Sequence, residues 1–388
     1  MKLVLIGPVY PYKGGISHYT GLLYRALCKT NDVTLISYKM QYPKILFRKE
    51  QRDYSNDVFK IDDARFLINT ANVFNILKVA KIINEINPDA ILLQWWHPYF
   101  APCYKILTGH LKKNIKVLFT CHNVFPHERF PMDKNLTKMV LKQGDGFIVQ
   151  SVKDENDLRS IKADANVRFN PHPTYNAFRI RNISCKEARS EIVAKDGFKI
   201  EDNNKLLLFF GFVREYKGLK HIFNAMPEIT LKYPECRLLV VGSFGDDKQS
   251  YIDLIEKNGQ KDFVYLKDTY TPDNEVEKYF SAADLVVLPY EDATQSGIVQ
   301  IAYGFEKPVL VTRVGGLPDV VTHLKTGYVV EPFDSKAIAD GVMDFYANSR
   351  SDMMREAIKA EAYKFSWEHM VESIEGLVNE QLSGSTQL

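Results

Sequence analysis

The hydrophobic residues of this chain fall into short apolar runs separated by stretches of helical periodicity. Short runs bounded by polar or glycine-containing loops predict buried parallel strands, and apolar residues spaced three and four positions apart predict helices between them. The expected strands are Lys2–Ile6, Val33–Ser37, Asp89–Gln94, Lys116–Thr120, Gly146–Gln150, Val167–Phe169, Lys205–Phe210, Arg237–Val241, Phe263–Leu266, Leu285–Leu288, Val309–Thr312 and Gly327–Val330. Strand and helix alternate throughout, which predicts an α/β fold.

The alternation restarts after Asn170-Pro171-His172-Pro173, so we expect two doubly wound, Rossmann-like domains. We place an N-terminal domain at 1–172 and a C-terminal domain at 173–364. The tail 365–388 is expected to form a last amphipathic helix, with Met370, Ile374 and Leu377 on one face.

The composition is that of an ordinary globular protein, with 388 residues, 45% hydrophobic and 25% charged. Five scattered cysteines without a CxxC spacing argue against a disulfide framework or a structural zinc site and fit a reducing cytoplasm. A strand at the very start predicts no signal peptide, and no apolar run is long enough to span a membrane.

The near-neutral net charge of +2 conceals an asymmetry. Residues 1–170 carry 25 Lys and Arg against 15 Asp and Glu, whereas the remainder carries 25 against 33. A basic first half indicates an anionic partner, such as a phosphorylated acceptor or an anionic membrane surface. Nucleic acid is disfavoured because the basic residues are dispersed and form no stripe.

The stretch Tyr38–Arg52 mixes basic side chains with apolar ones. Its basic residues include Lys44, Arg48, Lys49 and Arg52, interspersed with Met40, Tyr42, Ile45, Leu46 and Phe47. This pattern is typical of a membrane-interface or lipid-acceptor patch, and equally of a solvated loop with a few packing residues. We therefore expect a cytoplasmic protein. Peripheral contact with the inner face of the cytoplasmic membrane is one alternative for this stretch.

The C-terminal domain contains a candidate anion site between Asp284 and Asp319. A loop after the strand Leu285–Leu288 ends in Thr294-Gln295-Ser296-Gly297, where the next helix begins. Free N–H groups and the helix dipole favour a phosphate there. The alternative is that Ser296 only caps the helix.

A second loop of this domain, Gly211–Gly218, carries Arg214 and Lys217 after the strand Lys205–Phe210. Two cations at such a loop suit a diphosphate, although ion pairs with neighbouring acids such as Glu215 are the alternative. Thr269 and Tyr270 follow a further strand and could hold a nucleobase.

The N-terminal domain offers two candidate ligand positions. Gly14-Gly15 open a helix after the first strand and would let the backbone approach a ligand, or simply form a tight turn. The fingerprint G-x-G-x-x-G is absent, which disfavours a nicotinamide dinucleotide. His122 and Asn123 end a strand, where open α/β sheets bind ligands, but a lone His is often only structural.

These motifs together resemble the retaining glycosyltransferases of the GT-B architecture, in the large family 4, group 1, that includes sucrose synthase and bacterial mannosyl- and glucosyltransferases. The resemblance spans essentially the whole chain. It is carried, in order, by Gly14-Gly15, Thr120-Cys121-His122-Asn123, Gly211–Gly218, the loop and helix after Pro289-Tyr290, Val314-Gly315-Gly316-Leu317-Pro318-Asp319 and Phe365-Ser366-Trp367-Glu368.

The resemblance implies two domains facing across a cleft, with the last helix crossing back to the first domain. It implies a hexose-type transfer from a UDP- or GDP-sugar to a glycan or lipid-linked acceptor in bacterial surface glycan synthesis, without metal or cofactor. His122, Arg214 and Lys217 would act in catalysis. The expected donor-binding residues are Gly14, Gly15, Asn123, Gly211, Tyr290, Thr294, Gln295, Ser296, Gly297 and Gln300, with Thr269 and Tyr270 at the nucleobase.

The chain departs from the family pattern in two places. Gly211-Phe212 stands where many members have Gly-Arg, so Arg214 is assigned in its stead. Ala293 and Ile301 occupy the places of two family glutamates, leaving Glu291, Asp292 or Gln300 as replacements. The missing pair keeps open a non-catalytic nucleotide-sugar or glycan-binding protein and, less favoured, a sugar epimerase.

Overall fold

The structure is a computed structural model, and it describes residues 1–47, 50–54, 60–126, 131–245 and 247–383. The chain divides into two compact units, each with its own parallel sheet. Unit 1 consists of Met1–Pro171 and Ser366–Leu388, and unit 2 consists of His172–Phe365.

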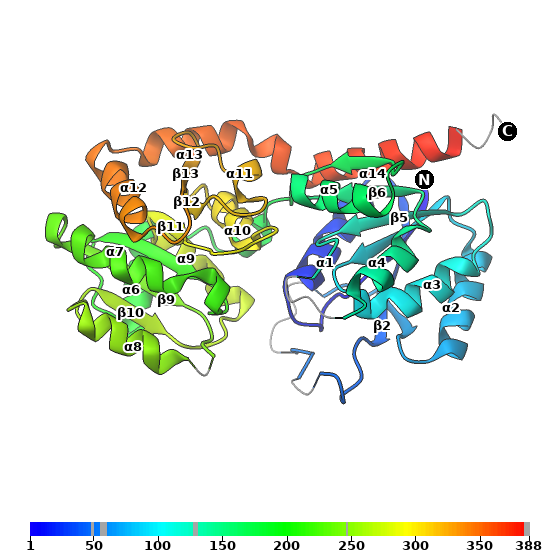
Figure 1. The fold of residues 1–388 in the computed structure, drawn as a ribbon, viewed down its shortest axis with the longest axis horizontal. Helices are drawn as coiled ribbons and strands as arrows, with labels where there is room; N and C mark the ends of the chain where they lie inside the picture. The colour runs from blue at the N-terminus through cyan, green and yellow to red at the C-terminus, as the bar shows by residue number, and fades with distance from the viewer. Residues whose placement is uncertain (48–49, 55–59, 127–130, 246, 384–388) are drawn as a thin grey trace. The chain divides into compact units, whose positions relative to one another are not determined.

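Unit 1 contains a seven-stranded parallel sheet in the order β3-β2-β1-β4-β5-β6-β7. Figure 1 shows strands of this sheet, among them β2, β5 and β6, with helices around them. The strands wind outward from β1 in both directions, which is the doubly wound arrangement. Their bounds are β1 (Lys2–Ile6), β2 (Asp32–Met40), β3 (Arg65–Asn69), β4 (Ala90–Trp95), β5 (Lys116–Cys121), β6 (Gly146–Val149) and β7 (Val167–Phe169).

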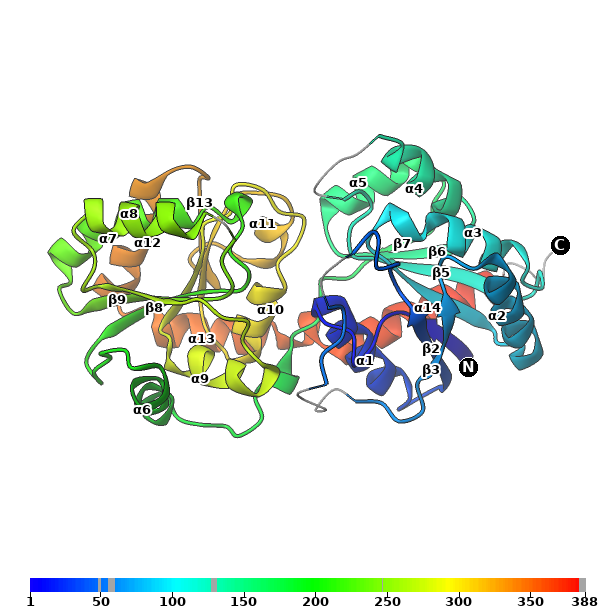
Figure 2. The same ribbon diagram turned by 90° about the horizontal axis from the view of Figure 1, so that it is seen from below.

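Helices cover both faces of this sheet, because successive side chains of each strand point to opposite faces. Leu3 and Leu5 of β1 pack with α1 and α14, whereas Val4 and Ile6 pack in the core formed with α2, α3, α4 and α5. Figure 2 shows these two groups of helices on opposite sides of the sheet. These helices are α1 (Gly15–Leu27), α2 (Val73–Ile86), α3 (Ala101–Gly109), α4 (Asp133–Leu141), α5 (Val152–Ile161) and α14 (Trp367–Ser383), with the 3-10 turn η1 (Pro98–Phe100).

The C-terminal helix α14 belongs to unit 1. Met370, Ile374 and Leu377 are fully buried in the core it shares with α1. Burying each such side chain stabilises the fold by about 1.5–3 kcal/mol. At the exposed side of this contact, Lys29 forms an ion pair with Glu368, with 2.9 Å between the ammonium and the carboxylate oxygen. The amphipathic pattern of the tail thus correctly predicted a packed helix.

Unit 2 contains a six-stranded parallel sheet in the order β10-β9-β8-β11-β12-β13. The strands are β8 (Lys205–Phe210), β9 (Cys236–Val241), β10 (Val264–Lys267), β11 (Leu285–Leu288), β12 (Val309–Thr312) and β13 (Gly327–Val330). The helices are α6 (Cys185–Asp196), α7 (Leu219–Lys232), α8 (Lys248–Lys257), α9 (Val276–Ala282), α10 (Gly297–Gly304), α11 (Leu317–Val320), α12 (Ser335–Ala347) and α13 (Ser351–Ala360), with 3-10 turns η2 (Asn176–Phe178), η3 (Glu215–Lys217), η4 (Asp273–Glu275) and η5 (Ala362–Phe365).

The winding of both sheets confirms the predicted α/β class with two Rossmann-like domains. In each unit the strands run parallel, so the loops that follow them leave the sheet at one edge. In unit 2 this carboxyl edge receives the loops after β8 and β11, which carry the residues predicted to bind a diphosphate, and the loop after β10, which carries those predicted to hold the nucleobase.

Candidate functional site

The loop after β8 brings the Lys217 ammonium over the backbone of Gly211. Gly211 has φ 107°, and a Cβ built there would lie 3.2 Å from Lys217 Nζ and 3.5 Å from Ile298 in the first turn of α10. The small residue therefore leaves the space that the ammonium uses. Lys217 and the start of α10 are brought together, as the sequence predicted.

Among the residues that the structure describes, Lys217 has no acidic partner. In the part of the chain that the structure describes, no ion pair or hydrogen bond of its ammonium is found, and the nearest aromatic face is Tyr290, 5.7 Å away. Burial lowers the pKa of Lys217 to about 8, with a smaller contribution from the Arg214 guanidinium. Arg214 and Lys217 thus form a pair of cations with no ion pair to an acid in the described part of the chain, and an anion would stabilise them.

The N-terminus of α10 lies beside this cation. Ser296 occupies the cap position, but its hydroxyl does not cap the helix and lies 3.4 Å from the Tyr290 hydroxyl instead. Among the described residues, none accepts a hydrogen bond from the amides of Gly297 and Ile298. The simple capping alternative for Ser296 is therefore wrong, and the helix start is left open to an anion.

Two glycines fix the loops around this site. A Cβ at Gly218, which has φ 62°, would lie 2.0 Å from the carbonyl oxygen of Pro289. One at Gly315, with φ 50°, would lie 1.5 Å from that of Ala293. Close backbone contacts thus tie the loop after β11 to the loops after β8 and β12.

The expected nucleobase residues lie on the loop after β10. Tyr270 stacks on Phe212 with ring centroids 6.2 Å apart, and both rings are about half exposed. Thr269 Oγ1 donates to the carbonyl oxygen of Tyr270 at 3.3 Å. Phe212, which the sequence presented only as a departure from Gly-Arg, supplies the second ring of an aromatic platform at the carboxyl edge.

The candidate replacements for the missing glutamates differ in their surroundings. Glu291 Oε1 accepts hydrogen bonds from His221 Nε2 and Lys220 Nζ, both at 2.8 Å. Burial alone would raise the pKa of Glu291, but these two partners hold it below its usual range. Gln300 is fully buried, and its side-chain oxygen has no partner among the described residues. The structure shows no contact that assigns either residue, or Asp292, to a donor.

His122 in unit 1 is buried at the ends of β4 and β5. Its Nε2 lies 2.8 Å from Oε1 of Gln94, the fifth residue of β4. Its ring meets Tyr19 of α1 edge-on, with centroids 4.6 Å apart. Neither Gln94 nor Tyr19 was predicted from sequence, because a lone polar residue in an apolar strand gives no sign of its partner.

Gly14 and Gly15 form the turn into α1. Gly14 has φ 105°, and a Cβ there would meet nothing within 4 Å. Gly15 is the first residue of α1, and Asn123 directly follows His122 after β5. Gly14 and Gly15 thus lie at a helix start, and His122 and Asn123 lie at the carboxyl end of a strand. Parallel sheets present ligand groups at such places.

The stretch Tyr38–Arg52 is only partly a surface patch. Tyr38 is buried in the core, whereas Ile45 and Leu46 are 84% and 64% exposed. Arg52 donates to the hydroxyl of Tyr12 and to the Lys39 carbonyl oxygen. Arg48 and Lys49 lie outside the described residues.

No three His, Cys, Asp or Glu side chains gather as metal ligands in the described ranges. Within the same ranges, no helix is both long and apolar enough to cross a membrane.

Comparison with known proteins gives the class. Residues 13–173 match the family described as Glycosyltransferase Family 4, and residues 192–365 match Glycosyl transferases group 1. The chain belongs to the group 1 glycosyltransferases, as the motifs predicted.

Among curated relatives, an uncharacterized glycosyltransferase of Methanocaldococcus jannaschii is 30% identical over 49% of this chain and 47% of its own length. The N-acetyl-alpha-D-glucosaminyl L-malate synthase of Bacillus anthracis is 23% identical over 68% of this chain and 66% of its own length. The chain spans about half the length of most of the curated relatives it matches.

Solved structures share the fold over the whole chain. Sucrose-phosphate synthase of Thermosynechococcus elongatus superposes with TM-score 0.71 at 18% identity, covering 98% of this chain and 99% of its own. HepE of Anabaena in complex with UDP and glucose gives TM-score 0.74 at 15% identity, covering 98% and 100%. These structures are GT-B glycosyltransferases, so the predicted architecture is confirmed.

Proposed function

We propose that this protein is a retaining, metal-independent glycosyltransferase that moves a hexose-type sugar from a UDP- or GDP-sugar to a glycan or lipid-linked acceptor. The observation that carries the proposal is the Lys217 ammonium, which has no acidic partner among the described residues and lies between Gly211 and the open start of α10. Complexes of HepE with UDP and UDP-glucose favour UDP as the nucleotide.

The proposed chemistry needs stabilisation of a leaving diphosphate. The bond between sugar C1 and the phosphate oxygen breaks, the acceptor hydroxyl oxygen bonds to C1, and its proton leaves with the nucleotide diphosphate. Negative charge therefore develops on the diphosphate, where Lys217, Arg214 and the amides of Gly297 and Ile298 would stabilise it. Phe212 and Tyr270 would hold the base, and His122 would face the sugar.

The test is release of nucleotide diphosphate from a panel of UDP- and GDP-sugars with candidate acceptors. Lys217→Ala should lower turnover by about 100–1,000-fold, the usual loss when one charge-stabilising contact is removed. Lys336→Ala, on the outer surface of α12, should leave turnover unchanged. A wild-type protein that binds no nucleotide sugar, together with an unaltered Lys217→Ala variant, would contradict the proposal.

A second candidate function is nucleotide-sugar binding without turnover. It is favoured by Ala293 and Ile301, which are buried where the family carries glutamates, and by Glu291, which is already engaged by Lys220 and His221. Tight donor binding without diphosphate release over a broad acceptor screen would support it. Conversion of the donor without a change in mass would instead support an epimerase.

A further inference from the structure

Unit 2 contains a second set of cations at the edge of the sheet opposite to the candidate donor site. A cavity of about 210 Å³ lies among the segment before α6, the end of α9, the turn before β12 and the start of α13. Ser281 precedes β11, and Lys307 and Pro308 precede β12, so the cavity lies where these strands begin. The donor loops lie at the other ends of these strands. β11 and β12 have 4 residues each, so at about 3.3 Å per residue their two ends are about 13 Å apart.

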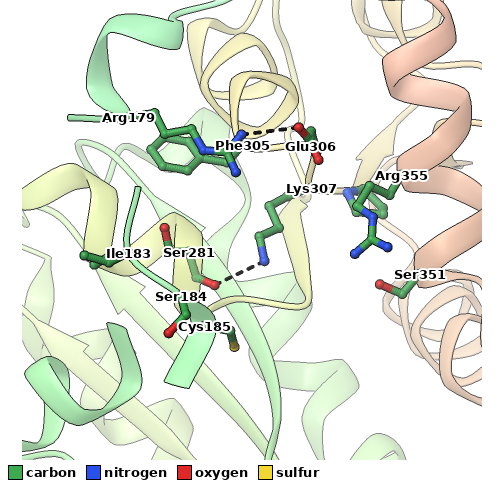
Figure 3. A pocket seen from close by; sticks show the side chains of 11 residues that line it. Arg179, Ile183, Ser184, Cys185, Ser281, Phe305, Glu306, Lys307, Ser351 and Arg355 are labelled. Carbon is green, nitrogen blue, oxygen red and sulfur yellow. Dashed lines mark hydrogen bonds and ion pairs between the residues drawn. The ribbon is translucent and has the colours of Figure 1, made fainter. Parts of the chain in front are cut away.

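Three cationic side chains line this cavity, namely Arg179, Lys307 and Arg355. Figure 3 shows the Lys307 side chain in the middle of the lining residues, with Arg355 and Ser351 on one side and Ser281 and Cys185 on the other. The only acidic lining residue is Glu306. The positive charge is therefore in excess.

Lys307 has no acidic partner in the described ranges of the chain. Its ammonium donates to the carbonyl oxygen of Ser281 at 3.1 Å. The two oxygens of Glu306 are occupied by Arg179 at 3.2 Å and Lys359 at 3.5 Å. The nearby Asp284 is paired with Arg189 at 3.2 Å.

An ammonium held this way is costly unless an anion joins it. Burial lowers the pKa of Lys307 and outweighs the raising effect of Cys185 and Asp284, while the positive charges of Arg189 and Arg355 lower it further. Arg355 adds a forked donor from α13, and its guanidinium also contacts Asp352 at 2.9 Å and Glu356 at 3.8 Å. The hydroxyl-bearing residues Ser281 and Ser351 complete a lining that suits phosphate oxygens. The hydroxyl of Ser184 is not available, because it caps α6 and donates to Glu187 at 2.8 Å.

We propose that this cavity is a second anion site, which binds a phosphate group either free in solution or on a small metabolite. The phosphate would accept from Lys307 and Arg355 and join the turn before β12 to α13. The site depends on no residue of the candidate donor site, so it stands or falls independently of the proposed function.

The test is calorimetric titration of the full chain with inorganic phosphate and with glycerol 3-phosphate, at ionic strength held constant with NaCl. Binding should persist in the Arg214→Ala/Lys217→Ala variant, in which the donor site is disabled. It should weaken about tenfold or more in Lys307→Gln, because a charge-assisted hydrogen bond is lost. Lys336→Gln should bind as the wild type does.

Several outcomes decide the proposal. Binding of inorganic phosphate alone would identify free phosphate as the occupant, and binding of both probes would identify a phosphate-bearing metabolite as accessible to the site. Absence of binding, or binding that disappears in Arg214→Ala/Lys217→Ala and is unchanged in Lys307→Gln, would overturn it. Should Lys307→Gln fail to fold, Arg355→Gln on the surface of α13 provides the same comparison.

Cys185 gives a local readout, because it lines the cavity and is exposed. Of the other cysteines, Cys28 is exposed and the remaining three are buried. In a Cys28→Ser variant, a thiol reagent should therefore label Cys185 first, and saturating phosphate should slow that labelling. An unchanged labelling rate at saturating phosphate would contradict the site.

Discussion

At the scale of single residues, Lys217 is the main candidate for diphosphate binding, and its lowered pKa predicts that donor use depends on pH. Its pKa is lowered to about 8, so the free protein carries the cation fully only below that pH. Deprotonation removes the charge that would attract a diphosphate. We therefore expect kcat/KM for the donor to fall as pH rises through about 8.

The measurement is the pH profile of kcat/KM for wild type and for Lys217→Arg. Because a guanidinium stays charged at these pH values, the fall should disappear in Lys217→Arg even if the activity is lower overall. A fall at the same pH in both proteins would assign it to another group.

Gln94 is the second residue with a specific expectation, which rests on the proposed function. Its side-chain oxygen holds His122 Nε2 at 2.8 Å, so it is a positioning residue for that ring. Gln94→Leu should lower kcat by about tenfold or more through a displaced imidazole, with little change in the donor KM. Gln94→Glu keeps an acceptor oxygen and should restore most of the loss, which a purely structural role would not predict.

At the scale of elements, the close approach of the loop after β8 to the loop after β11 requires a glycine at position 218. Gly218→Ala would bring Cβ to 2.0 Å from the Pro289 carbonyl oxygen at a positive φ. We expect a loss of about 2–4 kcal/mol in the free energy of unfolding, measured by urea denaturation.

Gly259→Ala is the matched control for this variant. Its φ of 65° is nearly the same, but a Cβ there would meet nothing within 4 Å. It should cost only the backbone strain, about 1 kcal/mol. Equal losses in the two variants would mean that the contact with Pro289 is unimportant.

The elements also show how far sequence reasoning reaches. Strands with continuous apolar runs, such as Lys205–Phe210 and Leu285–Leu288, were predicted with their observed bounds. β3 was missed, because Arg65–Asn69 is an edge strand in which Arg65 and Phe66 are exposed. α7 runs without a break to Lys232, although Pro227 lies inside it.

The residues of the candidate site could be named where a local sequence pattern, such as a loop after a strand or a helix start, indicates them. Contacts between distant segments could not be predicted in this way. Lys217 was named as a cation on the loop after β8, the start of α10 from its helix-start pattern, and Gly211 from the family resemblance; the structure brings the three together. The Phe212–Tyr270 stack and the Gln94–His122 hydrogen bond join residues far apart in sequence. Such pairs depend on strand order, which periodicity does not specify.

At the scale of the whole molecule, the charge asymmetry and the exposed apolar loop of unit 1 bear on membrane contact. Ile45 and Leu46 are 84% and 64% exposed beside Lys44. We expect the protein to bind vesicles that contain anionic lipid, and binding to weaken with salt. An Ile45→Asn/Leu46→Asn variant should bind more weakly by at least about tenfold, because each buried side chain contributes about 1.5–3 kcal/mol.

Leu231→Asn is the control for this variant, since Leu231 of α7 is 86% exposed but lies in the acidic part of the chain. Co-sedimentation with vesicles of increasing anionic content measures all three proteins. Leu231→Asn should bind as the wild type does. If Ile45→Asn/Leu46→Asn also binds as the wild type does, the apolar loop has no role at the membrane, and the basic character of unit 1 is better explained by an anionic acceptor in solution.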